Sequence, residues 1–187
     1  IEVLGTTIDD AAGEAFDKVS KYYGFGYPGG AVIDKLAQKG NKQAAKFPTP
    51  IFHDQKHRYD VSYSGLKTAV INQIDQFWNK DYPKTPENIA ASFQEAAVKT
   101  LVSRLLLACD DTGIKTVVAG GGVAANSRLR QLLSERSDIH CVFPPLKLCG
   151  DNGAMIAGVA YKFFQRGDIS PWNIGCTSRI QGFRRPR

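Results

Sequence analysis

A run of three glycines follows the β-branched residues 116–118 and precedes a basic amphipathic run; these are Gly120, Gly121 and Gly122. A strand that delivers glycines to a helix start brings bare N–H groups and the positive helix end together, which favours phosphate. Asn126 falls where the helix is expected to begin, so its amide could cap the helix or bind a ligand. The spacing fits neither the dinucleotide fingerprint nor the Walker loop, so a tight turn for close packing is an equal alternative.

Carboxylates stand near similar turns elsewhere in the chain. Asp151, in the stretch CGDNGA, lies between an expected strand and a helix. It could cap that helix or give one oxygen ligand to a metal ion, although a metal site needs several donors. Asp17 lies on an acidic helix that leads into a Pro-Gly-Gly turn, and Asp34 follows that turn. A solvated acidic face is the default interpretation, and binding of ribose hydroxyls is the alternative.

The histidine spacing of a metal pair occurs once, at His53 and His57. Prolines precede this stretch and it has no apolar helical face, so a helix that aligns both rings is not expected. His140 falls in an expected strand and is interpreted as structural. The cysteines form no CxxC pair and indicate a reduced setting; they are Cys109, Cys141, Cys149 and Cys176.

The expected elements alternate between strand and helix in the last third of the chain, which predicts an α/β fold. A mostly parallel sheet with flanking helices would bind ligands at the carboxyl ends of its strands. Residues 41–57 are expected to form an exposed connection. The patterns predict strands at 59–63, 115–119 and 139–143, and helices at 7–24, 31–38, 64–78, 86–109, 126–135 and 152–165.

The composition is that of an ordinary globular protein of 187 residues with a net charge of +6. The basic balance is a weak indication of an anionic partner. No apolar run reaches the length of about 20 residues that spans a bilayer, and the first residues do not resemble a signal peptide. A cytoplasmic protein is therefore expected. Because the sequence opens without Met, as if within a sheet, we expect it to be part of a longer protein.

Five motifs in order give the chain a resemblance to a known family: DDAAGEAFDK, YPGG, SYSGLKTAV, AGGGVAANSRLR and CGDNGAMIAG. Together they resemble the TsaD family of tRNA threonylcarbamoyladenosine synthases, formerly called glycoproteases. The resemblance covers residues 4–165. It implies the second lobe of a two-lobed actin, hexokinase and sugar-kinase fold, with a helical insertion at about 31–112 and the first lobe outside this sequence.

The resemblance also implies roles for individual residues. The residues that would bind threonylcarbamoyl-adenylate are Asp17, Gly30, Asp34 and Asn126, with the glycine loop near the phosphate or the adenosine. Asp151 would be a metal ligand, and the implied cofactor is one divalent metal per complete subunit, iron rather than zinc. The other family ligands form an HxxxH pair in the first lobe, and that role does not transfer to His53 and His57.

The implied reaction transfers a threonylcarbamoyl group from threonylcarbamoyl-AMP to the adenosine 3′ of the anticodon in tRNAs reading codons that begin with A. The implied partners are tRNA and, in a bacterium, an inactive paralogue and a small ATPase, but neither DNA nor a membrane. A non-catalytic scaffold with the same fold is the main alternative. A metalloprotease ranks last, because the zinc-protease pattern HExxH does not occur.

Overall fold

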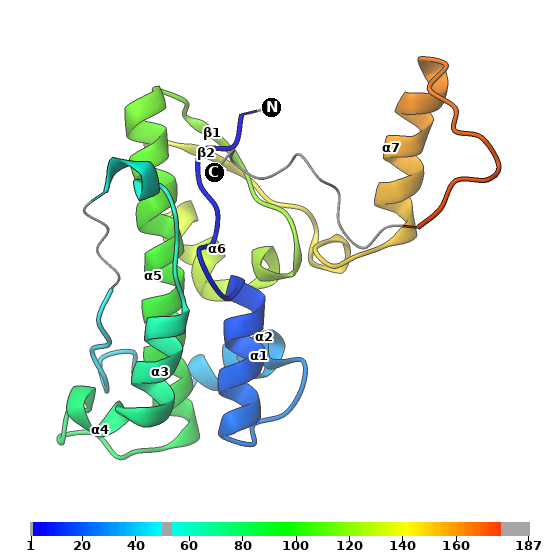
Figure 1. Cartoon of the computed structure of the whole chain (residues 1–187). Coiled ribbons are helices and arrows are strands. Elements are labelled where there is room, and N and C mark those ends of the chain that lie inside the picture. Colours follow the sequence, from blue (N-terminus) through cyan, green and yellow to red (C-terminus); the bar gives the residue numbers. More distant parts are fainter. Residues whose placement is uncertain (1, 50–53, 177–187) are drawn as a thin grey trace.

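The longest helix, α5 (Pro86–Thr112), forms the spine of the molecule in the computed structural model, which describes residues 2–49 and 54–176 (Figure 1). The hydroxyl of Thr85 accepts a hydrogen bond from the N–H of Asn88 at 3.2 Å and so caps the helix start. Gly113 ends the helix with a φ of 72°, a left-handed conformation that favours glycine. The predicted helix at 86–109 is confirmed and extends one turn further.

The core lies between α5 and three shorter helices, α1 (Ala12–Tyr22), α2 (Gly29–Ala37) and α3 (Ser64–Asn72). Its centre is an edge-to-face pair of aromatic rings, Phe16 and Phe93, with centroids 5.0 Å apart. Phe93 is fully buried. This ring pair joins α1 to the spine, and α2 contacts both α1 and the spine, so the core fixes the position of both helices.

A two-stranded parallel sheet follows the spine and makes the protein α/β. Strand β1 (Thr116–Val118) pairs with β2 (His140–Val142), with Val117 opposite Cys141. The connection between them is the glycine loop, a 3-10 turn η2 (Gly122–Ala125) and the helix α6 (Ser127–Ser134), which contacts α5. The expected strand–loop–helix–strand order is confirmed, and each strand is shorter than predicted.

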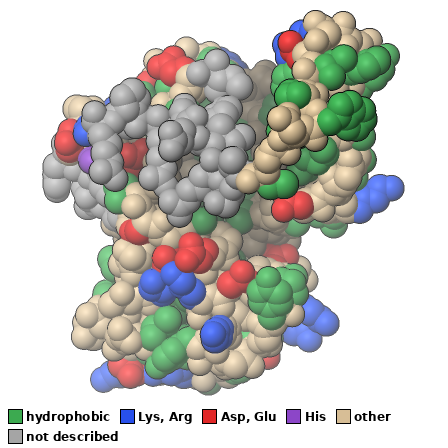
Figure 2. Space-filling view, turned by 45° about the vertical axis from the view of Figure 1, so that its right-hand side comes forward, with side chains coloured by type: hydrophobic (Ala, Val, Ile, Leu, Met, Phe, Trp, Pro, Cys, Tyr) green, Lys and Arg blue, Asp and Glu red, His purple; other side chains and the backbone are tan. Residues whose placement is uncertain are grey.

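The last helix, α7 (Gly153–Gln165), stands apart from this body in Figure 1, beyond the 3-10 turn η3 (Leu146–Leu148). Hydrophobic side chains gather on this projecting part in Figure 2. The large exposed ones on the helix are Met155, Ile156, Val159, Tyr161, Phe163 and Phe164. Among the described residues, no helix combines the length and the apolar character needed to cross a membrane.

Two expected elements near the middle of the chain are wrong. Residues 59–63 form no strand; Val61 makes only an isolated parallel bridge to Thr7. The helix expected at 64–78 breaks at Gln73, which leaves α3 and the single turn α4 (Ile74–Phe77). The break lets the aromatic residues that follow pack against the core.

The connection expected to be exposed at 41–57 is largely packed where it is described. Ala44, Ala45 and Phe47 are buried. The N–H of Ala45 donates to the hydroxyl of Ser92 on the spine at 3.0 Å, which fixes the segment to α5. The stretch contains prolines and lysines, which favour an exposed connection, but the three buried apolar residues decide where the segment lies.

The start of α1 is organised differently from the prediction that Thr7 or Asp9 would cap it. Ala11 occupies the cap position. Asp9 instead accepts hydrogen bonds from the N–H groups of Tyr63 and Ser64, at 2.7 and 3.2 Å, at the start of α3. Burial raises the pKa of Asp9, but hydrogen bonds from Ser62, Ser64 and the backbone outweigh it and lower the pKa to about 2.

Candidate functional site

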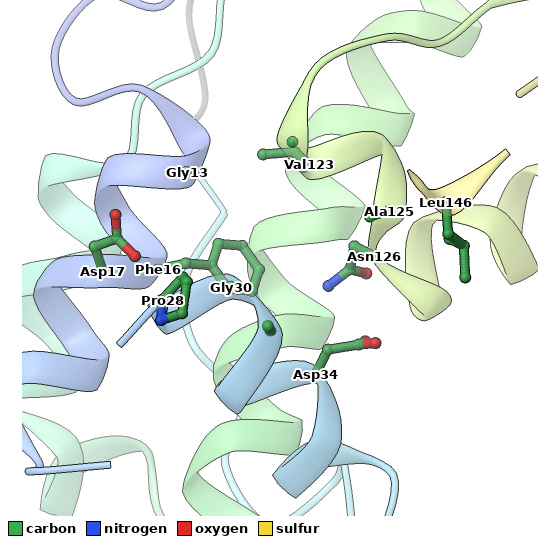
Figure 3. Close-up of a pocket in the computed structure, with 12 residues that line it drawn as sticks. Gly13, Phe16, Asp17, Pro28, Gly30, Asp34, Val123, Ala125, Asn126 and Leu146 are labelled. Atoms are coloured by element: carbon green, nitrogen blue, oxygen red, sulfur yellow. The ribbon is translucent and has the colours of Figure 1, made fainter. Parts of the chain in front are cut away.

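A cavity of about 520 Å³ opens between α1 and α2 on one side and the glycine-loop segment on the other (Figure 3). Its walls are mainly apolar, with three polar side chains among them. The apolar walls include Phe16, Pro28, Val123 and Leu146. The polar groups are Asp17, Asp34 and Asn126. An apolar hollow with a few convergent polar groups is the usual form of a small-molecule site.

Asp17 joins the two helices on one side of this cavity. Its Oδ1 accepts a hydrogen bond from the N–H of Gly29 at 2.7 Å and so caps α2, whose own cap residue, Pro28, makes no side-chain bond. A Cβ at Gly29 would lie 2.6 Å from the Cα of Asp17, so only glycine permits this approach. Within residues 2–49 and 54–176, its other oxygen, Oδ2, accepts no hydrogen bond.

Gly30 is also in the first turn of α2, but its surroundings differ. A Cβ there meets nothing within 4 Å, and the residue lines the cavity. The absence of a side chain at Gly30 therefore keeps space open for a ligand. Asp17 and Gly30, which the sequence places 13 positions apart, lie at the same cavity.

The opposite wall is held by hydrogen bonds between distant segments. Asp34 Oδ1 accepts from the N–H and the hydroxyl of Ser127, at 3.2 and 2.7 Å. Asn126, only 7% exposed, accepts from the N–H of Leu129 at 3.0 Å and donates to Gln94 Oε1 at 2.8 Å. The predicted cap at Asn126 is confirmed. Asn126 therefore caps the start of α6. A bound phosphate would have to accept hydrogen bonds from the backbone N–H groups of the glycine loop instead of from the start of this helix.

The glycine loop forms the tight turn that was one of its two interpretations. A Cβ at Gly120, Gly121 or Gly122 would meet nothing within 4 Å, so close packing does not require these glycines. Gly121 has a φ of 81°, so the turn itself requires glycine. Gly122 lines the cavity, whereas Gly120 and Gly121 do not. Within residues 2–49 and 54–176, the N–H groups of these three glycines donate no hydrogen bond. A row of free N–H groups beside a cavity suits an anionic group.

Asp151 lies elsewhere. It is exposed and does not line the cavity. The alternative that it caps the last helix is wrong, because Asn152 holds that position and accepts from the N–H of Met155 at 3.0 Å. In the described part of the chain, no group of three or more His, Cys, Asp or Glu side chains is arranged to hold a metal.

The two histidines with metal-pair spacing do not form a site that the structure describes. His57 Nδ1 lies 2.8 Å from Asp60 Oδ2 within the short turn η1 (Gln55–His57) and its flank. His53 lies outside the described residues. The donors that the structure describes do not by themselves fit a metal ion.

Sequence reasoning missed Gln94, which positions Asn126 from the spine. Gln94 is buried within the apolar run of α5, and such a polar residue among buried neighbours needs a partner. The next residue, Glu95, bonds Arg128 through both oxygens at 2.6 and 3.0 Å. Burial raises the pKa of Glu95, but hydrogen bonds from Arg128 and Lys99 lower it overall. The sequence signal that could have revealed this contact is the pair of adjacent polar residues, Gln94 and Glu95, within an otherwise apolar stretch.

The structure defines an α/β protein with a ligand-sized cavity beside a glycine-rich strand-to-helix turn. The family model of tRNA N6-adenosine threonylcarbamoyltransferase, TsaD, matches residues 1–158, and the chain belongs to this family. A Treponema denticola protein of that name is 67% identical over 98% of this chain and 54% of its own length. Proteins of that name from Treponema pallidum subsp. pallidum and Borreliella afzelii are 55% and 47% identical over 98% of the chain. The chain spans about half the length of these relatives.

Proposed function

We propose that this chain is the nucleotide-binding half of a tRNA N6-adenosine threonylcarbamoyltransferase. It corresponds to the second lobe of an actin-like fold, with residues 31–112 as a helical insertion. The observation that carries the proposal is that Asp17, Gly30, Asp34 and Asn126 line one cavity. The motifs alone imply an adenylate role for these residues, and a shared cavity is what that role requires.

The cavity offers each part of threonylcarbamoyl-AMP a suitable surface. Apolar side chains such as Val123 and Leu146 suit the faces of the adenine ring. Asp17 and Asp34 each use Oδ1 for bonds within the described part of the chain, so their Oδ2 atoms can accept hydrogen bonds from ribose hydroxyls. The N–H groups of the glycine loop can donate to the phosphate.

In the proposed reaction the exocyclic amine of the tRNA adenosine attacks the carbamoyl carbon of the adenylate. A carbon–nitrogen bond forms, the carbon–oxygen bond to the phosphate breaks, and AMP leaves while the amine loses a proton. The chain's residues bind and orient the AMP portion. Holding it in one orientation lowers the entropic cost of bringing the reacting groups together. The implied divalent metal, iron rather than zinc, has at most Asp151 as a ligand among the described residues.

The proposal extends to partners and location. The tRNA would be the acceptor substrate, and a bacterial protein of this kind would work with an inactive paralogue and a small ATPase in the cytoplasm. The non-catalytic scaffold is the competing function. The two differ in a measurable way, because a scaffold has no need for an open adenylate cavity.

The test is AMP binding by calorimetry with the natural full-length protein. Gly30→Leu should weaken AMP binding at least tenfold, because the new side chain enters the cavity. Gly65→Leu is the matched control: Gly65 is also in the first turn of a helix with open space around it, but it does not line the cavity. Its AMP affinity should match that of the unsubstituted protein.

Absence of AMP binding by the unsubstituted protein would favour the scaffold. Equal AMP affinity for Gly30→Leu and Gly65→Leu would show that AMP binds outside this cavity. Either result would overturn the assignment of the site.

A further inference from the structure

A stretch between Asp34 and Asp54 contains no acidic residue and carries several lysines. Three of them, Lys39, Lys42 and Lys46, follow α2 and run along the spine; together we call them the lysine surface. All three are exposed, and within the described residues none forms an ion pair. Unpaired lysines grouped on one strip of surface create a positive potential that attracts anions.

The lysine surface borders two hollows that lie outside the nucleotide cavity. The first, of about 520 Å³, is lined by Lys39 and Lys42 together with amide side chains such as Asn41, Gln94 and Gln131. The second, of about 500 Å³, is lined by Lys42 and Lys46. Lys42 therefore belongs to both hollows, which makes the strip continuous.

The acidic side chain that lines both hollows does not cancel this charge. Glu95 is bonded to Arg128 Nε at 2.6 Å and to Lys99 Nζ at 3.0 Å. Its two cationic partners more than balance its carboxylate. No other acidic side chain is among the described residues that line the two hollows.

The first hollow shares a wall with the nucleotide cavity. Ser127 lines the hollow and bonds Asp34, which lines the cavity. Gln94 lines the hollow and bonds Asn126, which also lines the cavity. Only one layer of hydrogen-bonded side chains would therefore separate a ligand on the lysine surface from the site where the adenylate is proposed to bind.

We propose that the lysine surface binds the phosphate backbone of the tRNA, with the amides of the first hollow in contact with its riboses or bases. The inference rests on the proposed function and assigns it a substrate surface. A polyanion fits the strip because Lys42 lines both hollows, so the three lysines and the amide side chains beside them border one extended surface rather than a single point. An acidic protein partner is the competing occupant.

The test measures tRNA affinity of the natural full-length protein by filter binding, with an unmodified tRNA transcript and increasing KCl. Lys42→Gln with Lys46→Gln should lower the affinity about fivefold to tenfold. It should also reduce the slope of log affinity against log salt by about 1.5, since each phosphate contact contributes about 0.7 to 0.9. The control is Lys115→Gln with Lys162→Gln, which removes the same charge from exposed positions elsewhere.

Equal losses in the two double variants would reduce the effect to net charge and overturn the proposal. Unchanged tRNA affinity with weaker binding of a protein partner would assign the surface to that partner instead. AMP calorimetry on the same variants separates this inference from the proposed function. If the lysine variants still bind AMP and their tRNA affinity is unaffected, only the proposal for the lysine surface fails. If the unsubstituted protein binds no AMP, the proposed function fails.

Discussion

The helical body and α7 place similar aromatic side chains in opposite surroundings. Phe93 on α5 has no exposed surface, whereas Phe164 on α7 is 67% exposed. Both helices begin at a cap that their own sequence supplies, Thr85 and Asn152. Local signals therefore form a helix in either place, but only the body provides a partner within the described residues. Stability should depend on the body almost entirely.

The strongest test of this contrast is Phe93→Ala. The ring packs edge-to-face on Phe16 at the centre of the core, so its removal leaves a cavity that the neighbours cannot fill. We expect a loss of about 3 to 5 kcal/mol in the free energy of unfolding. Urea unfolding of the 187-residue chain, followed by circular dichroism, measures it. A loss below about 1 kcal/mol would mean that the core does not lie at this pair.

A second test examines the body at the junction of α1 and α3, where Asp9 caps α3. The pKa of Asp9 is lowered to about 2 in the folded protein, so its contribution is complete above the ordinary value near 3.8. This contribution declines as the pH falls below about 4 and is lost as the pH passes through the folded pKa of about 2. We expect the carboxylate of Asp9 to contribute about 1 kcal/mol to the free energy of unfolding, because Asp9 is largely exposed and solvent screens its charge.

The measurement compares the unsubstituted chain with Asp9→Asn at several pH values. The difference in unfolding free energy should be largest near pH 5, above the ordinary pKa of the carboxyl. It should shrink as the pH falls and disappear only below about pH 2, where the carboxyl of Asp9 is protonated in the folded protein as well. A difference that stays constant with pH would show that the carboxylate charge plays no part.

Sequence reasoning succeeded where a residue acts on its own segment. Asn126 caps the following helix as its position predicts, and the parallel strand order follows from the alternation of elements. It failed where a distant segment decides the structure. The burial of Phe47 depends on the spine, and the cap of α3 comes from Asp9, 54 residues before Tyr63.

The candidate site shows the same division. The residues at the cavity could be named from their motifs, since each motif is short. The hydrogen bonds between them could not, because Asp34 to Ser127 and Asn126 to Gln94 join segments 93 and 32 residues apart. Nothing local in the sequence states which distant partner a polar side chain will find.

The smallest effect is expected on α7, and it completes the comparison. Phe164→Ala removes the same ring as Phe93→Ala, but from a position that is 67% exposed. An exposed aromatic side chain has little burial to lose, so the free energy of unfolding of the chain should change by less than about 0.5 kcal/mol. The same urea titration measures it. A loss approaching that of Phe93→Ala would mean that α7 packs against the body in solution, and the contrast between the two regions would no longer hold.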